Sequence, residues 1–309
     1  MKALMGVFPV LPTVFGSDGA VDADETLAVA DYAIAAGAAG VVFPGLASEV
    51  EMLTADERID LTQRIGARVK GRASFIVGAS AATPEEAAQF AHHGAAAGAD
   101  VSMVMTPQGL ADDMDAMARF YDRVARESGI PVMLQNAPPP MGIGLPLEKV
   151  AAIAGAVDGV RYVKEEAQPS GQRITRLDEL AGASLDAVFG GAGARYVIDE
   201  LNRGATGTMP ASEITEAHVS MLARHRGGDI AGARDLFDRT LPLLSMQAIF
   251  RWRLTKEVLR RRGIISSSYV RAAGPALDRH DHQELDALLA RIADLLMPAA
   301  ERIAADGPQ

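Results

Sequence analysis

The sequence predicts an α/β fold, a (β/α)8 TIM barrel with a C-terminal helical appendage. Three observations support this prediction. The chain has 309 residues, a length at which such barrels form one unit. Its 49% hydrophobic and 23% charged residues suit a globular protein with a large core. Short apolar segments also alternate along the chain with longer segments of helical periodicity.

Eight short apolar segments, many ending in Gly, Pro, Thr or Ser, are the expected strands. They cover residues 6–15, 40–45, 74–80, 100–107, 131–138, 159–166, 186–193 and 204–212. Eight such segments at near-regular spacing favour a closed parallel barrel. An open doubly wound sheet is the alternative, but no G-x-G-x-x-G follows the first segment.

The segments between these strands have apolar residues three and four apart, the period of an α-helix. Thr54 before Glu57 and Thr83 before Glu86 are helix-start signatures, in which a hydroxyl accepts a free backbone N–H. After residue 212 the pattern is purely helical, with helices expected over 213–226, 229–262 and 281–305. We therefore expect a barrel over residues 1–226 and a helical extension over 227–309, packed together as one structural unit.

Composition excludes several classes of function. The net charge is −10 and the only basic run, residues 251–263, is expected to be a solvated helix face or an interface ion-pair ladder. Nucleic acid is therefore not an expected partner, because phosphate contacts need clustered Lys and Arg. The chain has no cysteine, signal-peptide pattern or apolar stretch long enough for a membrane span, so we expect a cytoplasmic protein without a membrane partner.

Lys164 is the main catalytic candidate. It ends the sixth expected strand, and a period-two pattern places it on the same face as Val160 and Tyr162, directed into the barrel. A lysine in an apolar cavity is more readily neutral and nucleophilic, and can condense with a ketone to an iminium. A structural lysine paired with Glu165 or Glu166 is the alternative.

The order of the strand-end motifs resembles the dihydrodipicolinate synthase / N-acetylneuraminate lyase family. The motifs are G-L-A-S-E (45–49), T-P (106–107), L-Q-N-A-P (134–138), V-K-E-E (163–166) and the glycine pair 190–191. The resemblance runs from about residue 6 to about residue 300. It implies a (β/α)8 homotetramer that binds 2-keto acids as a Schiff base on Lys164, with no cofactor or metal.

The departures from the family pattern narrow the expected chemistry. Gln135 stands where members commonly have a proton-relaying tyrosine, and glutamine cannot ionise. Gln135 together with the Lys-x-Glu of Lys164 and Glu166 is similar to the L-2-keto-3-deoxyarabonate dehydratase branch. The resemblance therefore implies Glu166 as the acid/base and Gln135 as an orienting group, although Glu166 could instead only fix Lys164.

The substrate-binding residues are expected at the ends of the same strands. Ser48 and the amides of Ala47 and Ser48 would hold the substrate carboxylate, or Ser48 would serve only as a loop hydroxyl. Glu49 is expected to close that turn. The remaining substrate-binding candidates are Thr13, Asn136, Gly190, Gly191 and Met209.

Three functions fit these residues. The first is dehydration of a 2-keto-3-deoxy sugar acid such as L-2-keto-3-deoxyarabonate through an iminium on Lys164. The second is a pyruvate-releasing aldolase, which the missing tyrosine makes less favourable. The third is a catalytically silent 2-keto-acid-binding protein. A metal-dependent aldolase is not expected, because no strand end supplies a His/Asp/Glu cluster.

Overall fold

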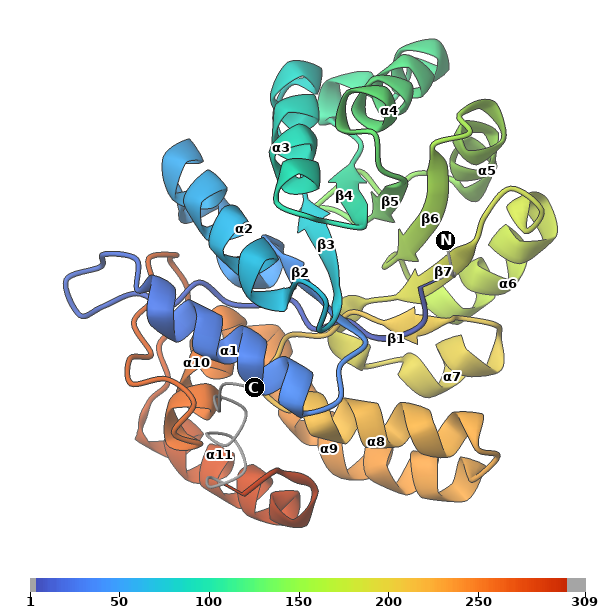
Figure 1. The fold of residues 1–309 in the computed structure, drawn as a ribbon. Coiled ribbons are helices and arrows are strands. Elements are labelled where there is room, and N and C mark those ends of the chain that lie inside the picture. The colour runs from blue at the N-terminus through green and yellow to red at the C-terminus, as the bar shows by residue number, and fades with distance from the viewer. Residues whose placement is uncertain (1–3, 299–309) are drawn as a thin grey trace.

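The computed structural model describes residues 4–298 and has eight parallel strands in a nearly closed barrel (Figure 1). The strand order is β1-β8-β7-β6-β5-β4-β3-β2. The predicted (β/α)8 barrel is therefore confirmed. The strands are β1 Gly6–Val7, β2 Gly40–Phe43, β3 Ser74–Gly78, β4 Val101–Met105, β5 Val132–Asn136, β6 Val160–Glu165, β7 Ala187–Gly190 and β8 Gly207–Thr208.

The first and last strands are much shorter than their predicted segments. Pro9 and Pro12 follow β1 and Pro210 follows β8, and proline has no N–H to donate to a sheet. An isolated parallel bridge between Val10 and Val42 joins the two ends of the sheet. The barrel thus continues past β1 in extended chain that is only partly paired.

Helices follow the strands around the outside of the barrel (Figure 1). Thr54 and Thr83 each accept the backbone N–H three residues ahead, as predicted from their capping motifs. The helices that surround the barrel are α1 Ala23–Ala35, α2 Ala55–Val69, α3 Pro84–Ala96, α4 Met114–Ser128, α5 Leu147–Ala156, α6 Ser170–Ala181, α7 Val197–Asn202 and α8 Thr215–Arg226.

Side chains on the inner face of the strands fill the barrel. Met133 and Tyr162 are neighbours in the register of β5 and β6, and both belong to the inner cluster. Val160 lies instead in the outer cluster under the helices, so the prediction that it shares a face with Tyr162 is wrong. The reason is a register irregularity beside Met133, which inverts the alternation between Val160 and Tyr162.

Between α8 and residue 298 lie three further α-helices, α9 Ile230–Phe250, α10 Trp252–Arg261 and α11 Arg279–Arg291. The single helix predicted over 229–262 is interrupted at Arg251, whose φ of 51° and ψ of −128° are not helical. The helix predicted over 281–305 begins earlier, after the N-cap Asp278, and ends at Arg291. The part of that prediction beyond residue 298 lies outside the described residues.

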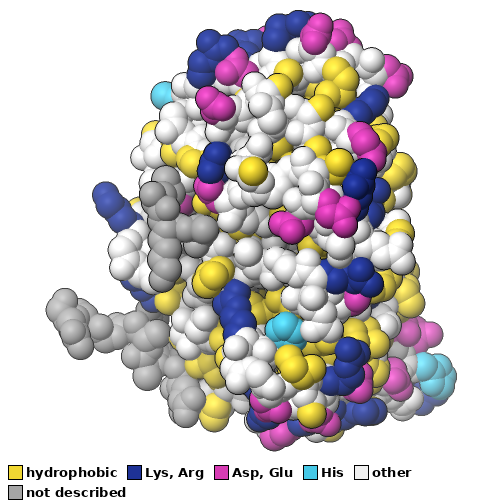
Figure 2. All heavy atoms as spheres, turned by 90° about the vertical axis from the view of Figure 1, so that its right-hand side faces the viewer, with side chains coloured by type: hydrophobic (Ala, Val, Ile, Leu, Met, Phe, Trp, Pro, Cys, Tyr) yellow, Lys and Arg dark blue, Asp and Glu magenta, His cyan; other side chains and the backbone are white. Residues whose placement is uncertain are grey.

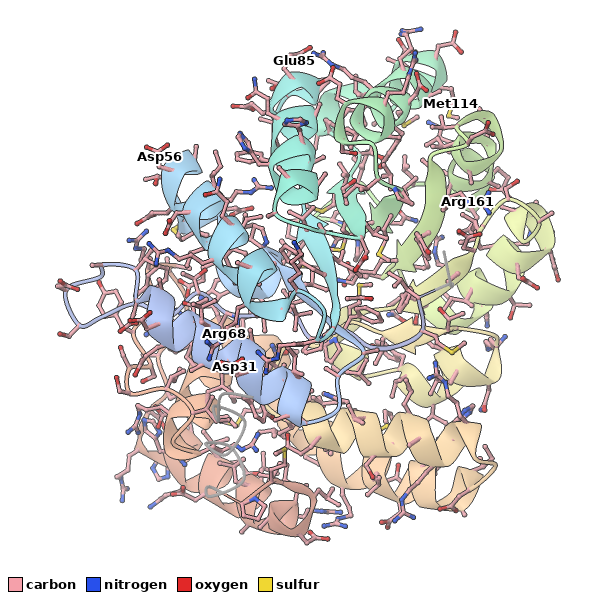
Figure 3. All side chains as sticks on the ribbon, viewed as in Figure 1. Asp31, Asp56, Arg68, Glu85, Met114 and Arg161 are labelled. Carbon is pink, nitrogen blue, oxygen red and sulfur yellow. The ribbon has the colours of Figure 1, made fainter. Side chains whose placement is uncertain are left out.

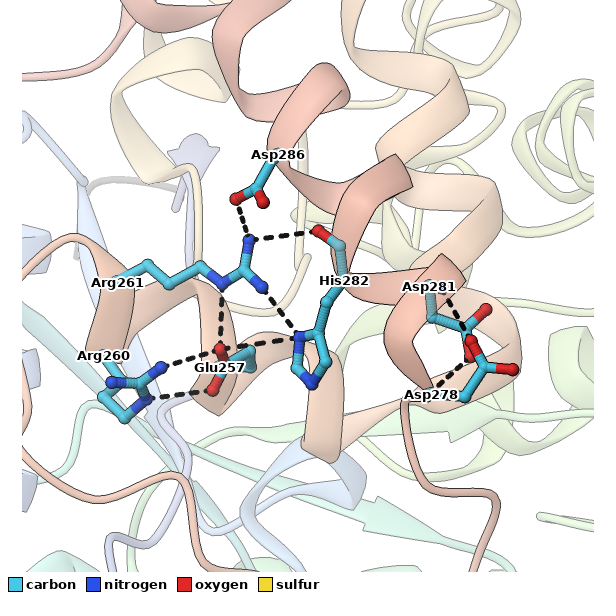
Figure 4. Close-up of polar contacts among 7 residues, drawn as sticks. All are labelled: Glu257, Arg260, Arg261, Asp278, Asp281, His282 and Asp286. Atoms are coloured by element: carbon cyan, nitrogen blue, oxygen red, sulfur yellow. Dashed lines mark hydrogen bonds and ion pairs between the residues drawn. The ribbon is translucent and has the colours of Figure 1, made fainter.

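The basic run of residues 251–263 forms ion pairs within the chain (Figure 4). On α10, Glu257 accepts from Arg260 at 2.9 Å and from Arg261 at 2.8 Å. Arg261 also contacts Asp286 and His282 of α11. This part of the run therefore attaches α11 to α10.

The molecular surface carries charges of both signs. On the face shown in Figure 2, Lys and Arg side chains alternate with Asp and Glu and form no continuous basic stripe. Figure 3 shows one such pair between neighbouring helices, where Arg68 of α2 points toward Asp31 of α1, with Nε 2.8 Å from Oδ2. Among residues 4–298, no helix combines the length and hydrophobicity that a membrane span needs.

Candidate active site

A cavity of about 300 Å³ lies at the carboxyl end of the barrel. Lys164 and Glu166 from the end of β6 line it, and the loop Gly45–Ala47 after β2 forms another part of its wall. Gln247 and residues 251–252, from the junction of α9 and α10, form a further part of the wall. Its size and position match the usual ligand site of this fold.

Lys164, Glu166 and Gln135 form one connected group. Lys164 Nζ lies 3.1 Å from Glu166 Oε1, and both side chains are almost fully buried. Gln135 is the register partner of Lys164 across β5 and β6, and its Nε2 donates to Glu166 Oε2 at 2.7 Å. The structure therefore brings the three predicted catalytic side chains together, with Glu166 at the centre.

Glu166 remains an anion in this buried position because donors surround it. Burial alone raises the pKa of Glu166, but the charge of Lys164 and the amide of Gln135 outweigh it and lower the pKa. The backbone N–H of Ala192 contributes a further hydrogen bond of 3.2 Å. A carboxylate placed in this way can accept a proton from the Lys164 ammonium or from a substrate carbon.

Glu165 points to the other side of the strand. It accepts from Asn136 Nδ2 at 2.9 Å and from Arg173 Nε at 3.0 Å. Burial, the larger effect, still raises the pKa of Glu165 against these two donors. Glu165 therefore belongs to the packing between the barrel and α6, and the ion-pair partner of Lys164 is Glu166.

The loop after β2 presents only part of the predicted carboxylate site. The Ser48 hydroxyl is fully buried, where it donates to Leu11 O and accepts from Gly45 N at 2.9 Å, and the Ser48 amide donates to Gly45 O. In place of a substrate contact, Ser48 thus closes its own turn. Ala47 lines the cavity, and no acceptor for its backbone N–H is found among residues 4–298.

Two of the other predicted ligands form hydrogen bonds within the protein, and a third packs against a buried carboxylate. Thr13 Oγ1 donates to Ser48 O at 2.8 Å, and Asn136 exchanges hydrogen bonds with the Leu145 backbone. Gly190 faces the Glu200 carboxylate on the outer side, where a Cβ would come within 1.9 Å of Oε2. These residues support the walls of the site, whereas Met209 lines the cavity itself.

Gly191 has a specific steric role. An added Cβ there would lie 2.5 Å from both Cγ and Oε1 of Glu166. Real Cβ atoms do not approach neighbouring atoms so closely, so a side chain at this position would displace Glu166. Gly191 is therefore a positioning residue for the carboxylate.

Four residues in the cavity wall were not predicted from the sequence. Arg195 follows the glycine-rich turn after β7, and Gln247, Arg251 and Trp252 come from the α9–α10 junction. A helical pattern continues through residue 251, so the break that brings Arg251 and Trp252 to the cavity is not visible from periodicity. The glycines at 190, 191 and 193 were the only sequence signal near Arg195.

The chain matches known proteins over nearly its whole length. The model of the Dihydrodipicolinate synthetase family matches residues 3–292. The chain belongs to this family. It is thus an enzyme of a family that contains dehydratases, aldolases and synthases, as the sequence motifs predicted.

Its relatives within the family catalyse different reactions. An L-2-keto-3-deoxyarabonate dehydratase from Azospirillum brasilense is 30% identical over 94% of this chain and 96% of its own. A probable 2-dehydro-3-deoxy-D-pentonate aldolase from Escherichia coli K12 is 26% identical over 81% of this chain and 83% of its own. The crystal structure of a dihydrodipicolinate synthase from Rhodopseudomonas palustris superposes with a TM-score of 0.86 at 26% identity, covering 94% of this chain and 99% of that one.

The cavity has no metal-binding cluster. Over residues 4–298, no group of three His, Cys, Asp or Glu side chains could hold a metal ion. The charged groups of the cavity wall are Lys164, Glu166, Arg195 and Arg251. These four side chains supply an amine, a carboxylate and two guanidinium groups.

Proposed function

We propose that this enzyme is a Schiff-base-forming hydro-lyase that dehydrates a 2-keto-3-deoxy sugar acid. The observation that carries the proposal is the group of Lys164, Glu166 and Gln135. It supplies a nucleophilic amine and one acid/base, and the residue at the usual tyrosine position cannot ionise. The similarity to the L-2-keto-3-deoxyarabonate dehydratase agrees with this choice.

The reaction begins with Lys164. Glu166 accepts a proton from the ammonium, and the free amine adds to the C2 carbonyl of the substrate. Glu166 returns this proton to the carbinolamine hydroxyl, which leaves as water and gives an iminium between Nζ and C2. The free amide of Ala47 is the group in the cavity wall best suited to the C1 carboxylate.

Elimination follows from the iminium. Glu166 removes a proton from C3, and the electron pair moves into the enamine. The enamine then expels the C4 hydroxyl, which takes a proton from Glu166 and leaves as water. Hydrolysis of the resulting unsaturated iminium and tautomerisation release a 2-keto product and restore the Lys164 amine. Gln135 donates to Glu166 throughout and so keeps its carboxylate oriented.

Aldol cleavage places a different demand on the site. It requires a base at the C4 hydroxyl while the C3–C4 bond breaks, and a phenol would serve this purpose. Gln135 occupies the corresponding strand end, and Tyr162 is buried in the barrel packing. Elimination needs only a group that reaches C3 and the C4 oxygen from one side, which a single carboxylate can do.

Two measurements test the proposal. Borohydride reduction in the presence of pyruvate should add one covalent mass on Lys164, and none in Lys164→Ala. A panel of 2-keto-3-deoxy acids should then give dehydrated 2-keto products rather than pyruvate and an aldehyde. Labelling that persists in Lys164→Ala would contradict the Schiff-base assignment. Faster release of pyruvate than of any dehydrated product would make the enzyme an aldolase.

A further inference from the structure

The charges in the cavity wall do not balance. The Lys164 ammonium and the Glu166 carboxylate form an ion pair, which leaves the guanidinium groups of Arg195 and Arg251. Neither arginine has a carboxylate partner within 4 Å among residues 4–298. In a chain of net charge −10, a cavity with two excess positive charges is suited to an anionic ligand.

Arg195 lies close to other polar groups of the wall. An ideal Cβ on Gly193 would be 3.1 Å from Arg195 Nη1 and 3.5 Å from Gln247 Oε1. The guanidinium and the Gln247 amide therefore lie against the same glycine, which has a left-handed φ of 65°. Both side chains are only partly buried, in contrast to Lys164 at 4% exposure.

Arg251 reaches the cavity from the junction of α9 and α10. Its left-handed φ of 51° interrupts the helix between α9 and α10, a conformation that costs a non-glycine residue free energy. Its guanidinium lies over the Trp252 ring, with Cζ 4.4 Å from the ring centroid, and Nη2 is 3.6 Å from Met141 Sδ. These neighbours hold the side chain without neutralising its charge.

We propose that Arg195 and Arg251 form a subsite for a second carboxylate, at the end of the substrate remote from Lys164. This inference rests on the proposed Schiff-base function, because Lys164 fixes the keto end of the substrate. C1 is bonded to C2 and must therefore lie deep, beside Lys164 and the Ala47 amide. The two arginines are more exposed than Lys164 and are therefore placed to bind the other end of the substrate.

The charge count favours a dicarboxylate. The ion pair of Lys164 and Glu166 is neutral, and so is the iminium together with the Glu166 carboxylate. Two arginines then balance two carboxylates, one at C1 and one at the far end. The preferred substrate is therefore a 2-keto-3-deoxy acid with a terminal carboxylate, an aldaric rather than an aldonic derivative.

Matched 2-keto acids isolate this subsite from the rest of the reaction. 2-Oxoglutarate and 2-oxopentanoate have the same five-carbon chain and differ in a terminal carboxylate or methyl group, and 2-oxoadipate and 2-oxohexanoate form the six-carbon pair. The readout is the concentration of each acid that gives half-maximal borohydride trapping on Lys164. For at least one pair, the dicarboxylate should be trapped at about 10- to 100-fold lower concentration, as charge-assisted hydrogen bonds allow.

The arginine variants complete the test. Arg195→Gln and Arg251→Gln should each reduce the preference for the dicarboxylate, and the double variant should abolish it, with each variant's trapping compared with its own trapping of pyruvate. Arg234→Gln removes an exposed positive charge from α9 away from the cavity and should keep the preference. Equal half-saturation within both pairs in the wild type, or a preference that survives in the double variant, would overturn the subsite.

Pyruvate separates the two proposals. It has no distal group, so its trapping depends only on Lys164 and the C1 carboxylate site. Absence of pyruvate trapping in the wild-type enzyme would reject the Schiff-base function. Normal pyruvate trapping without any dicarboxylate preference would reject the subsite alone.

Discussion

Glu166 is held by three donors of different kinds: an ammonium, a side-chain amide and a backbone N–H. The ammonium donor is lost when Lys164 becomes an iminium, because the iminium keeps the positive charge but has fewer N–H protons. The other two remain through the reaction. Gln135 and Ala192 therefore determine where the Glu166 carboxylate points at the moment it meets C3.

Substitution of Gln135 tests this arrangement. In Gln135→Glu a second carboxylate would face Glu166, and mutual repulsion should raise the pKa of the pair. The basic form of Glu166 would then be lost at a higher pH than in the wild type, so the acid limb of the pH–rate profile should move upward. Turnover should fall by about 10²–10⁴-fold, the contribution typical of acid–base catalysis.

Gln135→Met is the control for charge. It removes the amide donor without adding a carboxylate, so the acid limb should move in the same direction by a smaller amount. A profile for Gln135→Glu that overlays the wild-type profile would show that Gln135 does not act through Glu166. Gln135→Tyr should not increase dehydration.

Gly191→Ala is expected to impair catalysis without changing any reactive group. The new Cβ would meet Glu166 at 2.5 Å and displace the carboxylate from Lys164 and Gln135. Turnover should fall, and borohydride trapping of pyruvate should become slower, because Glu166 also takes the proton of the Lys164 ammonium. Gly155→Ala on α5 is the matched control, because nothing lies within 4 Å of its Cβ and alanine is the better helix former. Equal turnover of both variants would remove the positioning role of Gly191.

At the scale of the elements, the loop after β2 is attached to the C-terminal helices. Glu49 forms a fully buried ion pair with Lys256 of α10 and also accepts from the Ala272 backbone N–H at 2.7 Å. Lys256 in turn donates to Tyr269 O at 2.9 Å. The Glu49 carboxylate was predicted to close its own turn, but its partners are more than 200 residues away.

Lys256→Met should destabilise the protein strongly. It leaves Glu49 buried without its counter-charge, a change that costs about 3–5 kcal/mol of unfolding free energy. The double variant Lys256→Met/Glu49→Gln removes the unpaired charge and should recover most of that loss. Chemical denaturation of the wild type and the variants measures this coupling. A double variant no more stable than Lys256→Met would show that the pair is not the source of the effect.

The elements differ in how well the sequence predicts them. Lys164 and Glu166 could be predicted because catalytic side chains of a (β/α)8 barrel lie at the carboxyl ends of its strands. The bulge before Tyr162 left no trace in the pattern of apolar residues, and Val160 was therefore placed on the wrong face. Periodicity likewise cannot locate the break at Arg251, since every residue around it is compatible with a helix.

Ser48 and Thr13 show a second limit of prediction. Both are hydroxyl residues at the correct end of the barrel, so residue type and position suggested contact with the substrate. Their direction depends on a 3-10 turn at Leu46–Ser48 and on the carbonyl groups that happen to be near. Hydrogen bonds within the protein, which require the folded chain, decide which hydroxyl remains free.

At the scale of the whole molecule, buried carboxylates make stability depend on pH. Burial raises the pKa of Glu200 to about 7, against a hydrogen bond from Ser170 and with the nearby negative charge of Glu166. In the unfolded chain a glutamate titrates near pH 4.3. The folded state therefore holds this proton more tightly than the unfolded state over the interval between these values.

Glu200→Gln should be more stable than the wild type at neutral pH. The stabilisation from protonated Glu200 is fully present below about pH 4.3 and is lost as the pH rises through about 7, and it amounts to roughly 4 kcal/mol. Glutamine does not ionise, so the variant does not lose stability as the pH rises, and its side-chain oxygen can still accept from Ser170. Its melting temperature should match that of the wild type at pH 4.5 and exceed it at pH 8.

An exposed glutamate provides the comparison for Glu200. Glu179 on α6 is solvent-exposed and pairs with Arg176, so Glu179→Gln should leave the difference between pH 4.5 and pH 8 unchanged. If the melting temperatures of Glu200→Gln and the wild type differ by the same amount at both pH values, the proton at Glu200 does not control stability. The effect of that substitution would then be one of packing.

The position of Trp252 gives the enzyme an intrinsic optical reporter. It is the single tryptophan of the chain, it lies in the cavity wall, and the Arg251 guanidinium covers its ring. A ligand that draws the guanidinium toward itself changes the electric field and the solvent access at the indole. Ultraviolet emission can therefore follow occupancy of the cavity in real time, without a label and before any bond to Lys164 has formed.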